Sequence, residues 1–190
     1  MLRIICLLVL AFVVPVSAIA EITTFHETHT YLMGDNDSKN DARRICFLEV
    51  KRKILEKAGV YVESRTNVSN YQLIKDDISA YAAAMMTVGI EKEEWKASND
   101  TMSVTLSVKA VVDMDSIRSA FEKINKDDGL RKRIAEQQDQ LEALEQRLSN
   151  LQKQLEHIDG SRADALRDER DDVFKHIENI RASSVYEFWK

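Results

Sequence analysis

Cysteine and glycine are scarce in this sequence, and each scarcity excludes a class of protein. The two cysteines are Cys6, within an N-terminal apolar run, and Cys46, within a predicted helix. Cys46 alone cannot form an internal disulfide, so the chain is not a disulfide-stabilised scaffold. We expect Cys46 to be a buried apolar residue, with a reactive or intermolecular thiol as the alternative. The five glycines each fit a turn, a helix end or a strand, and none lies in a loop of the kind that binds phosphate.

Histidine is also scarce, and the net charge of −5 is mildly acidic. His26 and His29 differ by an odd number on a predicted strand, so they point to opposite faces and are not expected to share a metal ion. Because no nucleophile, base or set of ligands can be assembled from the pattern, we predict that the protein is not an enzyme and holds no cofactor. An acidic chain is also not expected to bind nucleic acid, since such proteins carry a basic surface.

The N-terminus has the features of a secretory signal peptide. Arg3 precedes an apolar run from Ile4 to Val14, and Ala18-Ile19-Ala20 places small residues where a signal peptidase recognises them. The run is shorter than the roughly 20 residues that a membrane-spanning helix needs. We therefore predict that residues 1–20 are cleaved after Ala20 and that the mature chain has no transmembrane span, with an uncleaved membrane anchor as the alternative.

The next part of the chain, residues 21–113, has the pattern of a small α+β domain. Strand patterns alternate with helical patterns and caps. Strands are predicted over about residues 21–33, 60–65, 86–95 and 101–112, and helices over about 39–58 and 70–84. Gly59 fits the left-handed position just beyond the first helix. The predicted order is β-α-β-α-β-β, a small sheet with two helices on one face.

After Asp113 nearly every residue fits a helical pattern. Residues 114–160 form a predicted coiled-coil segment, in which Asp127-Asp128-Gly129 either interrupts or softens the helix. Gly160-Ser161 marks a second break, and residues 161–190 form a predicted C-terminal helix with an aromatic tail.

A stripe of leucine and isoleucine residues, with one glutamine among them, runs along the coiled-coil segment at alternating steps of four and three, which is the heptad pattern. We call these nine residues the leucine stripe: Leu130, Ile134, Gln137, Leu141, Leu144, Leu148, Leu151, Leu155 and Ile158. Burial of one Leu or Ile stabilises a protein by roughly 1.5–3 kcal/mol, so a solvated stripe would forgo on the order of 10 kcal/mol. The leucine stripe must therefore pack against a partner.

Two partners fit the leucine stripe. One is the same helix in a second copy, which would make the protein a homo-oligomer. The other is the C-terminal helix, which continues a 4-3 pattern through Leu166, Val173 and Ile177, with Arg170 intruding. In that helical hairpin the shorter C-terminal helix would leave Leu130, Ile134 and Leu141 uncovered. A hairpin that also dimerises is compatible with both.

The first predicted helix is locally basic on an acidic protein. Six basic residues against two acidic residues, Glu49 and Glu56, give it a local charge of +4. The six basic residues are Arg43, Arg44, Lys51, Arg52, Lys53 and Lys57. The simplest interpretation is a solvated helix face. The functional interpretation is a docking surface for an acidic partner protein or an anionic polymer of the cell envelope.

Three stretches carry a resemblance to a known family: DARRICFLEVKRKILEKAGVYVES, IKDDISAYAAAMMTVGIEKEEW and VTLSVKAVVD. The region from about residue 21 to 113 resembles the small α+β domain at the N-terminus of flagellar assembly protein T and related domains of bacterial envelope lipoproteins. The shared positions belong to the core and the helix ends. The resemblance implies a bacterial, periplasmic, non-enzymatic component of an envelope assembly. The chain departs from the flagellar protein in having a coiled-coil segment in place of further domains.

These observations predict an exported structural or interaction protein of the envelope that oligomerises through the leucine stripe and whose partner is a second copy or an envelope protein. The alternative is a binding module in which the α+β domain binds a ligand or partner and the helices present it.

Overall fold

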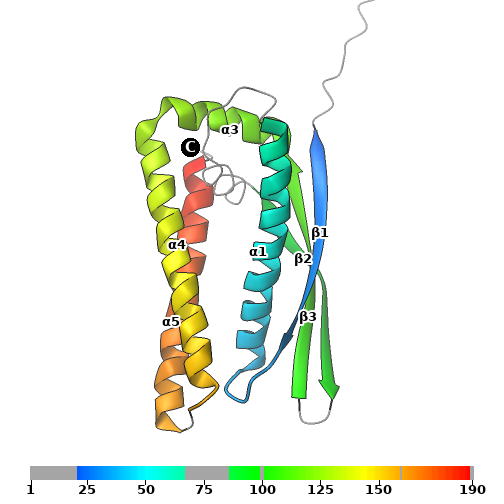
Figure 1. The fold of residues 1–190 in the computed structure, drawn as a ribbon, viewed down its shortest axis with the longest axis vertical. Helices are drawn as coiled ribbons and strands as arrows, with labels where there is room; N and C mark the ends of the chain where they lie inside the picture. Colours follow the sequence, from blue (N-terminus) through cyan, green and yellow to red (C-terminus); the bar gives the residue numbers. More distant parts are fainter. Residues whose placement is uncertain (1–20, 67–85, 99–100, 159, 189–190) are drawn as a thin grey trace, which may run out of the picture.

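The computed structural model describes residues 21–66, 86–98, 101–158 and 160–188. This part of the chain has an α+β fold, built of three strands and four helices. The elements in chain order are β1 (Ile22–Leu32), α1 (Lys39–Thr66), β2 (Thr87–Ser98), β3 (Thr101–Asp113), α3 (Met114–Lys126), α4 (Asp128–Leu155) and α5 (Ser161–Phe188). Figure 1 shows three layers, in which the pair α4 and α5 is separated from the sheet by α1, and α3 crosses one end.

The sheet is antiparallel, with strand order β1-β3-β2. β3 is central because its even-numbered residues form an apolar face, with Val104, Leu106 and Val108 fully buried. β1 pairs with β3 without interruption from Ile22 opposite Asp113 to Leu32 opposite Ser103. β2 pairs with the other side of β3 and contains a bulge between Ile90 and Lys92. The strands predicted over 86–95 and 101–112 are confirmed, with β2 extending a few residues further.

α1 covers one face of the sheet with a row of small and apolar residues at steps of four. The residues of this row are all fully buried: Ala42, Cys46, Val50, Ile54, Ala58 and Val62. A step of four advances the side chain by about 40° around the helix, so the row forms an inclined ridge that packs into the main core from Ala42 to Val62.

The predicted strand over residues 60–65 is wrong, because α1 continues through it to Thr66. The alternation of Val60 and Val62 was compatible with a strand, but Val62 also lies four residues after Ala58 and extends the buried row. Val60 points away from the core and is 62% exposed. Gly59 is an interior helical residue, and among the described glycines a positive φ occurs at Gly160.

Two further predictions lie outside the described residues: the signal peptide of residues 1–20 and the helix over about 70–84. Of the two helices predicted on one face of the sheet, the structure describes the first, α1. Asn99 and Asp100, which separate the strands predicted over 86–95 and 101–112, also lie outside the described residues.

α3 continues the main core beyond the last strand. Asp113 caps it by accepting hydrogen bonds from the backbone N–H groups of Asp115 and Ser116. The hydrogen bond from the Ser116 hydroxyl holds the pKa of Asp113 below its ordinary value. Met114, Ile117, Phe121 and Ile124 are buried in the same apolar cluster as the sheet and α1. The core is therefore continuous across the boundary predicted at residue 113, and we refer to β1, α1, β2, β3 and α3 together as the α+β unit.

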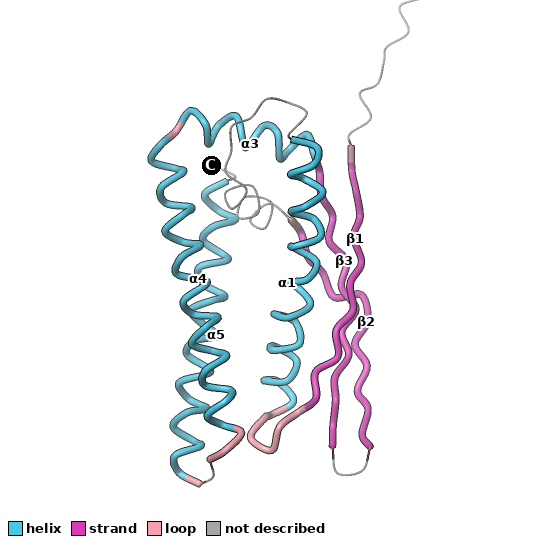
Figure 2. Tube along the Cα trace, in the orientation of Figure 1, coloured by secondary structure: helices cyan, strands magenta, loops and turns pink. Residues whose placement is uncertain are grey.

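α4 and α5 form a helical hairpin, seen beside α1 in Figures 1 and 2. α4 starts at Asp128, after Asp127 caps it with a hydrogen bond from the Leu130 N–H group, so the acidic stretch interrupts the helical segment. Gly160, with φ of 72°, lies in the turn between the two helices, where a left-handed conformation favours glycine. α5 begins at Ser161, as predicted.

Candidate functional site

The leucine stripe packs within the chain, and its three parts have different surroundings. At the C-terminal end, Leu148 and Leu151 are buried against Val173, Phe174 and Ile177 of α5. Ile45 of α1 joins the same cluster. This is the internal hairpin, one of the two partners considered for the stripe. Pairing of the stripe between two copies stays a prediction.

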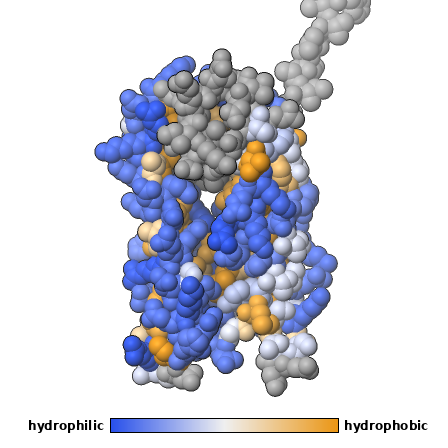
Figure 3. All heavy atoms as spheres, viewed as in Figure 1, coloured by the Kyte–Doolittle hydropathy of each residue, from blue (hydrophilic) through white to orange (hydrophobic). Residues whose placement is uncertain are grey.

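The N-terminal end of the stripe is covered by the α+β unit. Ile134 is 7% exposed and belongs to the main core, with Leu130 packed against it. The expectation that these two residues stay uncovered in a hairpin is wrong, because both pack into the main core, and Leu141, the third residue of that expectation, packs against the hairpin cluster. The middle of the stripe is less covered, since Gln137, Leu141 and Leu144 are half-buried. In the space-filling view of Figure 3, hydrophobic residues show in the hollow between the hairpin and α1.

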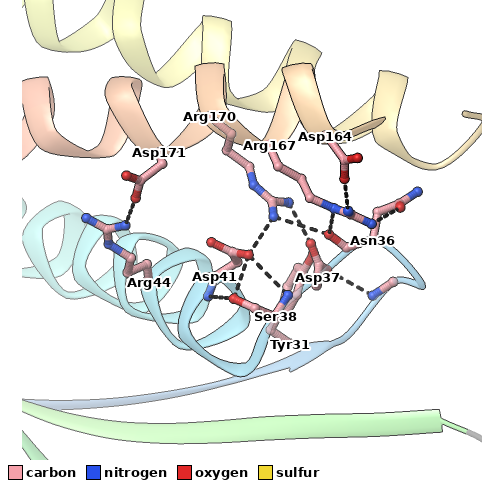
Figure 4. A network of polar contacts seen from close by, with 11 residues as sticks. Tyr31, Asn36, Asp37, Ser38, Asp41, Arg44, Asp164, Arg167, Arg170 and Asp171 are labelled. Carbon is pink, nitrogen blue, oxygen red and sulfur yellow. Dashed lines mark hydrogen bonds and ion pairs between the residues drawn. The ribbon is translucent and has the colours of Figure 1, made fainter. Parts of the chain in front are cut away.

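The hairpin is fixed to the α+β unit by a buried ion-pair network, which we call the Arg170 junction (Figure 4). Arg170 of α5 is 1% exposed, and its guanidinium lies 2.6 Å from Asp37 and 2.7 Å from Asp41. Asp37 precedes α1 and Asp41 lies in its first turn, where the helix dipole also favours a carboxylate. Two carboxylates around one buried guanidinium satisfy its charge, although its Nε has no hydrogen-bond partner among the described residues.

The loop between β1 and α1 provides the rest of the Arg170 junction. The amide nitrogen of Asn36 donates to the carbonyl oxygens of Leu155 at 2.6 Å and Ile158 at 2.9 Å, which closes the end of α4. Arg167 donates to the Asn36 carbonyl oxygen at 3.2 Å. Tyr31 donates its hydroxyl proton to Asp37 at 2.7 Å. Burial, together with that hydrogen bond, raises the pKa of Tyr31, so the hydroxyl stays a donor.

A second polar contact joins the second turn of α1 to α5. Arg44 binds Asp171 at 2.6 Å and Glu178 at 3.2 Å, and its guanidinium lies 4.6 Å from the centre of the Phe174 ring. Two turns further along α1, Lys51 faces Arg181 and Glu145, which pair with each other at 2.9 Å. Burial, with the nearby charge of Arg181, lowers the pKa of Lys51 to about 8.

The six cations of the predicted basic face do not share one open surface. Arg44 and Lys51 face the hairpin, as described above. Arg43 binds Glu93 of β2 at 2.7 Å, Lys57 pairs with Glu27 of β1, and Arg52 pairs with Glu49 on its own helix at 2.7 Å. The hydrogen bond from Lys57 lowers the pKa of Glu27. Lys53 lies 3.0 Å from the His29 ring, and burial, together with Lys53, lowers the pKa of that histidine. The acidic groups that these cations meet belong largely to this chain.

The remaining candidates for chemistry have structural surroundings. Cys46 is buried under the sheet, where its thiol lies 3.3 Å from the His29 carbonyl oxygen, and burial raises the pKa of the thiol. Within the described residues, no group of three or more histidine, cysteine, aspartate or glutamate side chains is placed to hold a metal ion. None of the helices in the described part of the chain is long and apolar enough to cross a membrane.

One signal of the Arg170 junction is visible in the sequence, where Arg170 interrupts an otherwise apolar pattern. Its partners Asp37 and Asp41 carry no such signal, because turns and helix starts favour aspartate whether or not a buried cation lies nearby.

Comparison with protein-family models, with curated proteins and with solved structures finds no match for the chain. The resemblance to the N-terminal domain of flagellar assembly protein T therefore stays a prediction.

Proposed function

We propose that the protein is an exported, non-enzymatic structural or interaction protein of the bacterial envelope, working in the periplasm. The observation that carries the proposal is the Arg170 junction. There, buried ion pairs fix the hairpin of α4 and α5 to the α+β unit. The two parts then form one body with long exposed surfaces on which a partner can bind. The signal-peptide pattern of residues 1–20 and the resemblance described above support the location.

Self-association through the leucine stripe would use its middle part. Leu141 and Leu144 pack in part against the hairpin cluster and are half-buried, so their exposed parts are where a second copy could pair. Leu144→Asp would then dissociate the oligomer, at a smaller cost to the fold than the same change at a fully buried residue of the stripe. Leu151→Asp would instead unfold the hairpin, because that side chain is 2% exposed against α5.

Export is tested by fractionation of cells that express the full chain from a bacterial promoter, followed by mass spectrometry. We expect a periplasmic protein whose N-terminus is Glu21. A variant with Ala18→Asp and Ala20→Asp, which alters only the residues that a signal peptidase recognises, should keep the precursor mass. A wild-type chain with an intact Met1 in the cytoplasmic or membrane fraction would contradict the proposal.

A second candidate is a binding module that uses the open face of the sheet. α1 covers one face, while the other exposes a row of hydroxyl side chains, among them Thr28 and Thr30 of β1 hydrogen-bonded to Ser107 and Thr105 of β3 at 3.0 and 2.8 Å. Such a polar, flat face can bind through hydrogen bonds without burying apolar area. Because α3 and Ile134 complete the core, the test needs the mature full chain. Loss of binding to purified envelope polymers in Thr28→Lys with Thr105→Lys, at unchanged stability, would favour this candidate.

A further inference from the structure

The two edges of the sheet differ in how they are protected from pairing. β2 carries a bulge and five charged residues among its twelve: Glu91, Lys92, Glu93, Glu94 and Lys96. Bulges and charges are the usual means by which an edge strand is kept from pairing with another chain. β1 has eleven residues, no bulge and one carboxylate, Glu27, and is otherwise rich in threonine and aromatic residues. β1 is therefore the unprotected edge.

The backbone of β1 has a defined row of groups directed to its free edge. Met33 donates its N–H to the Met102 carbonyl oxygen at 2.8 Å, and Met114 donates to Glu21 at 3.1 Å. Because hydrogen-bonded pairs alternate in an antiparallel ladder, the odd-numbered residues of β1 bond to β3. The even-numbered residues direct their N–H and C=O groups outward: Ile22, Thr24, His26, Thr28, Thr30 and Leu32.

These six residues are self-complementary under a two-fold axis at Glu27. In an antiparallel pair of two β1 strands centred there, Ile22 of one copy faces Leu32 of the other, and the residue numbers of every facing pair add to 54. Each even residue then faces an even residue, as the outward hydrogen bonds require, and six pairs with two bonds each satisfy the whole edge. Other registers that keep this parity leave part of β1 unpaired.

The side chains support the same register. Ile22 and Leu32 are 59% and 61% exposed, and lie at opposite ends of β1 on the open face. In the centred register Ile22 of one copy faces Leu32 of the other, so each copy covers the apolar residue that the other exposes. Thr24 faces Thr30 and His26 faces Thr28. The two Glu27 carboxylates meet at the axis, each paired with the Lys57 of its own copy.

We propose that the β1 edge is the interface of a two-fold symmetric dimer, in which two sheets join into one continuous six-stranded sheet. The partner is a second copy of this chain, paired in antiparallel orientation about Glu27. This interface lies on the sheet and is separate from the leucine stripe, so either can exist without the other.

The test is sedimentation equilibrium of the mature chain, residues 21–190, and of two proline variants. Thr24→Pro removes an outward N–H of β1, at an exposed side chain without a hydrogen bond among the described residues. Ala97→Pro is the matched control, because Ala97 is an exposed residue whose N–H is directed to the free edge of β2. We expect a dimer for the wild type and for Ala97→Pro. Thr24→Pro should weaken dimerisation by at least about a hundredfold, since symmetry introduces the proline twice.

Cross-linking gives a second measurement that does not depend on the proline variants folding. Facing residues at the axis form a non-hydrogen-bonded pair with Cα atoms about 4.5 Å apart, which is within the range of a disulfide. Glu27→Cys should therefore form a covalent dimer on oxidation, whereas Thr23→Cys, on the same face but four residues from the axis, should not.

A wild type that is monomeric at tens of micromolar concentration overturns the proposal, as does equal cross-linking of the two cysteine variants. A dimer that withstands Thr24→Pro but dissociates in Leu144→Asp would also overturn it, and would place the interface on the leucine stripe. A failure of export would leave the outcome of these measurements unchanged.

Discussion

The two faces of α1 are stabilised by different interactions. Toward the centre of the sheet, α1 presents a row of small and apolar residues, such as Val50 and Ile54, that are fully buried. Toward the hairpin, it presents Ile45 and Leu48 together with the charged Arg44 and Lys51. Burial on the first face stabilises in proportion to apolar area and tolerates small shifts. The second face depends also on ion pairs. Loss of one partner leaves the other charge buried and uncompensated, which lowers the stability of the protein.

α1 thus connects the sheet and the hairpin through two faces of different chemistry. An apolar face alone would bind α1 to any apolar surface, including a second copy of the hairpin. The Arg170 junction adds a positional requirement, because Arg170 must meet Asp37 and Asp41 at the N-terminal end of α1. We infer that the junction fixes the hairpin in one position along α1.

The largest effect is expected from breaking the Arg170 junction. Arg170→Met leaves two carboxylates with little exposure and no cation, which should lower the free energy of unfolding by about 3–5 kcal/mol. Urea denaturation followed by circular dichroism measures this. Hydrogen exchange should show the hairpin losing protection before the sheet does.

Two controls separate charge from packing in that experiment. Lys175→Met, on an exposed side chain of α5 that pairs with Asp171 and Asp172 of the same helix, should cost about 1 kcal/mol or less. Adding Asp37→Asn and Asp41→Asn to Arg170→Met should recover much of the loss, because the carboxylates are then neutral. If the triple variant is as unstable as Arg170→Met, packing of the arginine stem is responsible instead.

The contrast between the faces also explains what could be predicted from the sequence. The strand patterns of β2 and β3, the start of α5 at Ser161 and the α+β class follow from local patterns, and these predictions were confirmed. The end of α1 was misplaced because Val60 and Val62 fit two periods, and Gly59 was taken as a helix end. Only the position of the sheet, which buries Val62, decides between them.

The candidate site was less predictable for a related reason. Apolar stripes indicate that a partner exists, but any apolar surface satisfies them, so the partner of the leucine stripe stayed open. Ion pairs such as Arg44 with Asp171 join residues more than a hundred positions apart. Their spacing in the sequence carries no signal of that contact.

A smaller effect is expected from a variant that tests where the buried row of α1 ends. Val60→Pro should destabilise the protein by about 3 kcal/mol, because proline removes a helical hydrogen bond and clashes with the preceding turn. Val60→Ala is the control and should change the stability by less than about 0.5 kcal/mol, since the side chain is 62% exposed. Thermal unfolding of both variants measures the difference. Equal stability of the two would contradict a continuous helix to Thr66.

The smallest effect concerns Lys51 on the hairpin-facing side of α1, where the pKa of about 8 compares with an ordinary value of 10.5. The folded state disfavours the charged ammonium, so at pH 7 the buried charge lowers stability. Lys51→Met should then stabilise the protein at pH 7 by about 1–3 kcal/mol. From pH 8 to 10.5 the folded protein has released the proton while the unfolded chain still holds it, so the wild type gains stability as pH rises. The advantage of Lys51→Met should shrink over that range. Lys132→Met, which removes an exposed lysine of α4, should shift stability little at any of these pH values. Urea denaturation at pH 7, 8, 9 and 10 measures the trend, and a destabilising Lys51→Met would show that its ammonium forms a net favourable contact with Glu145.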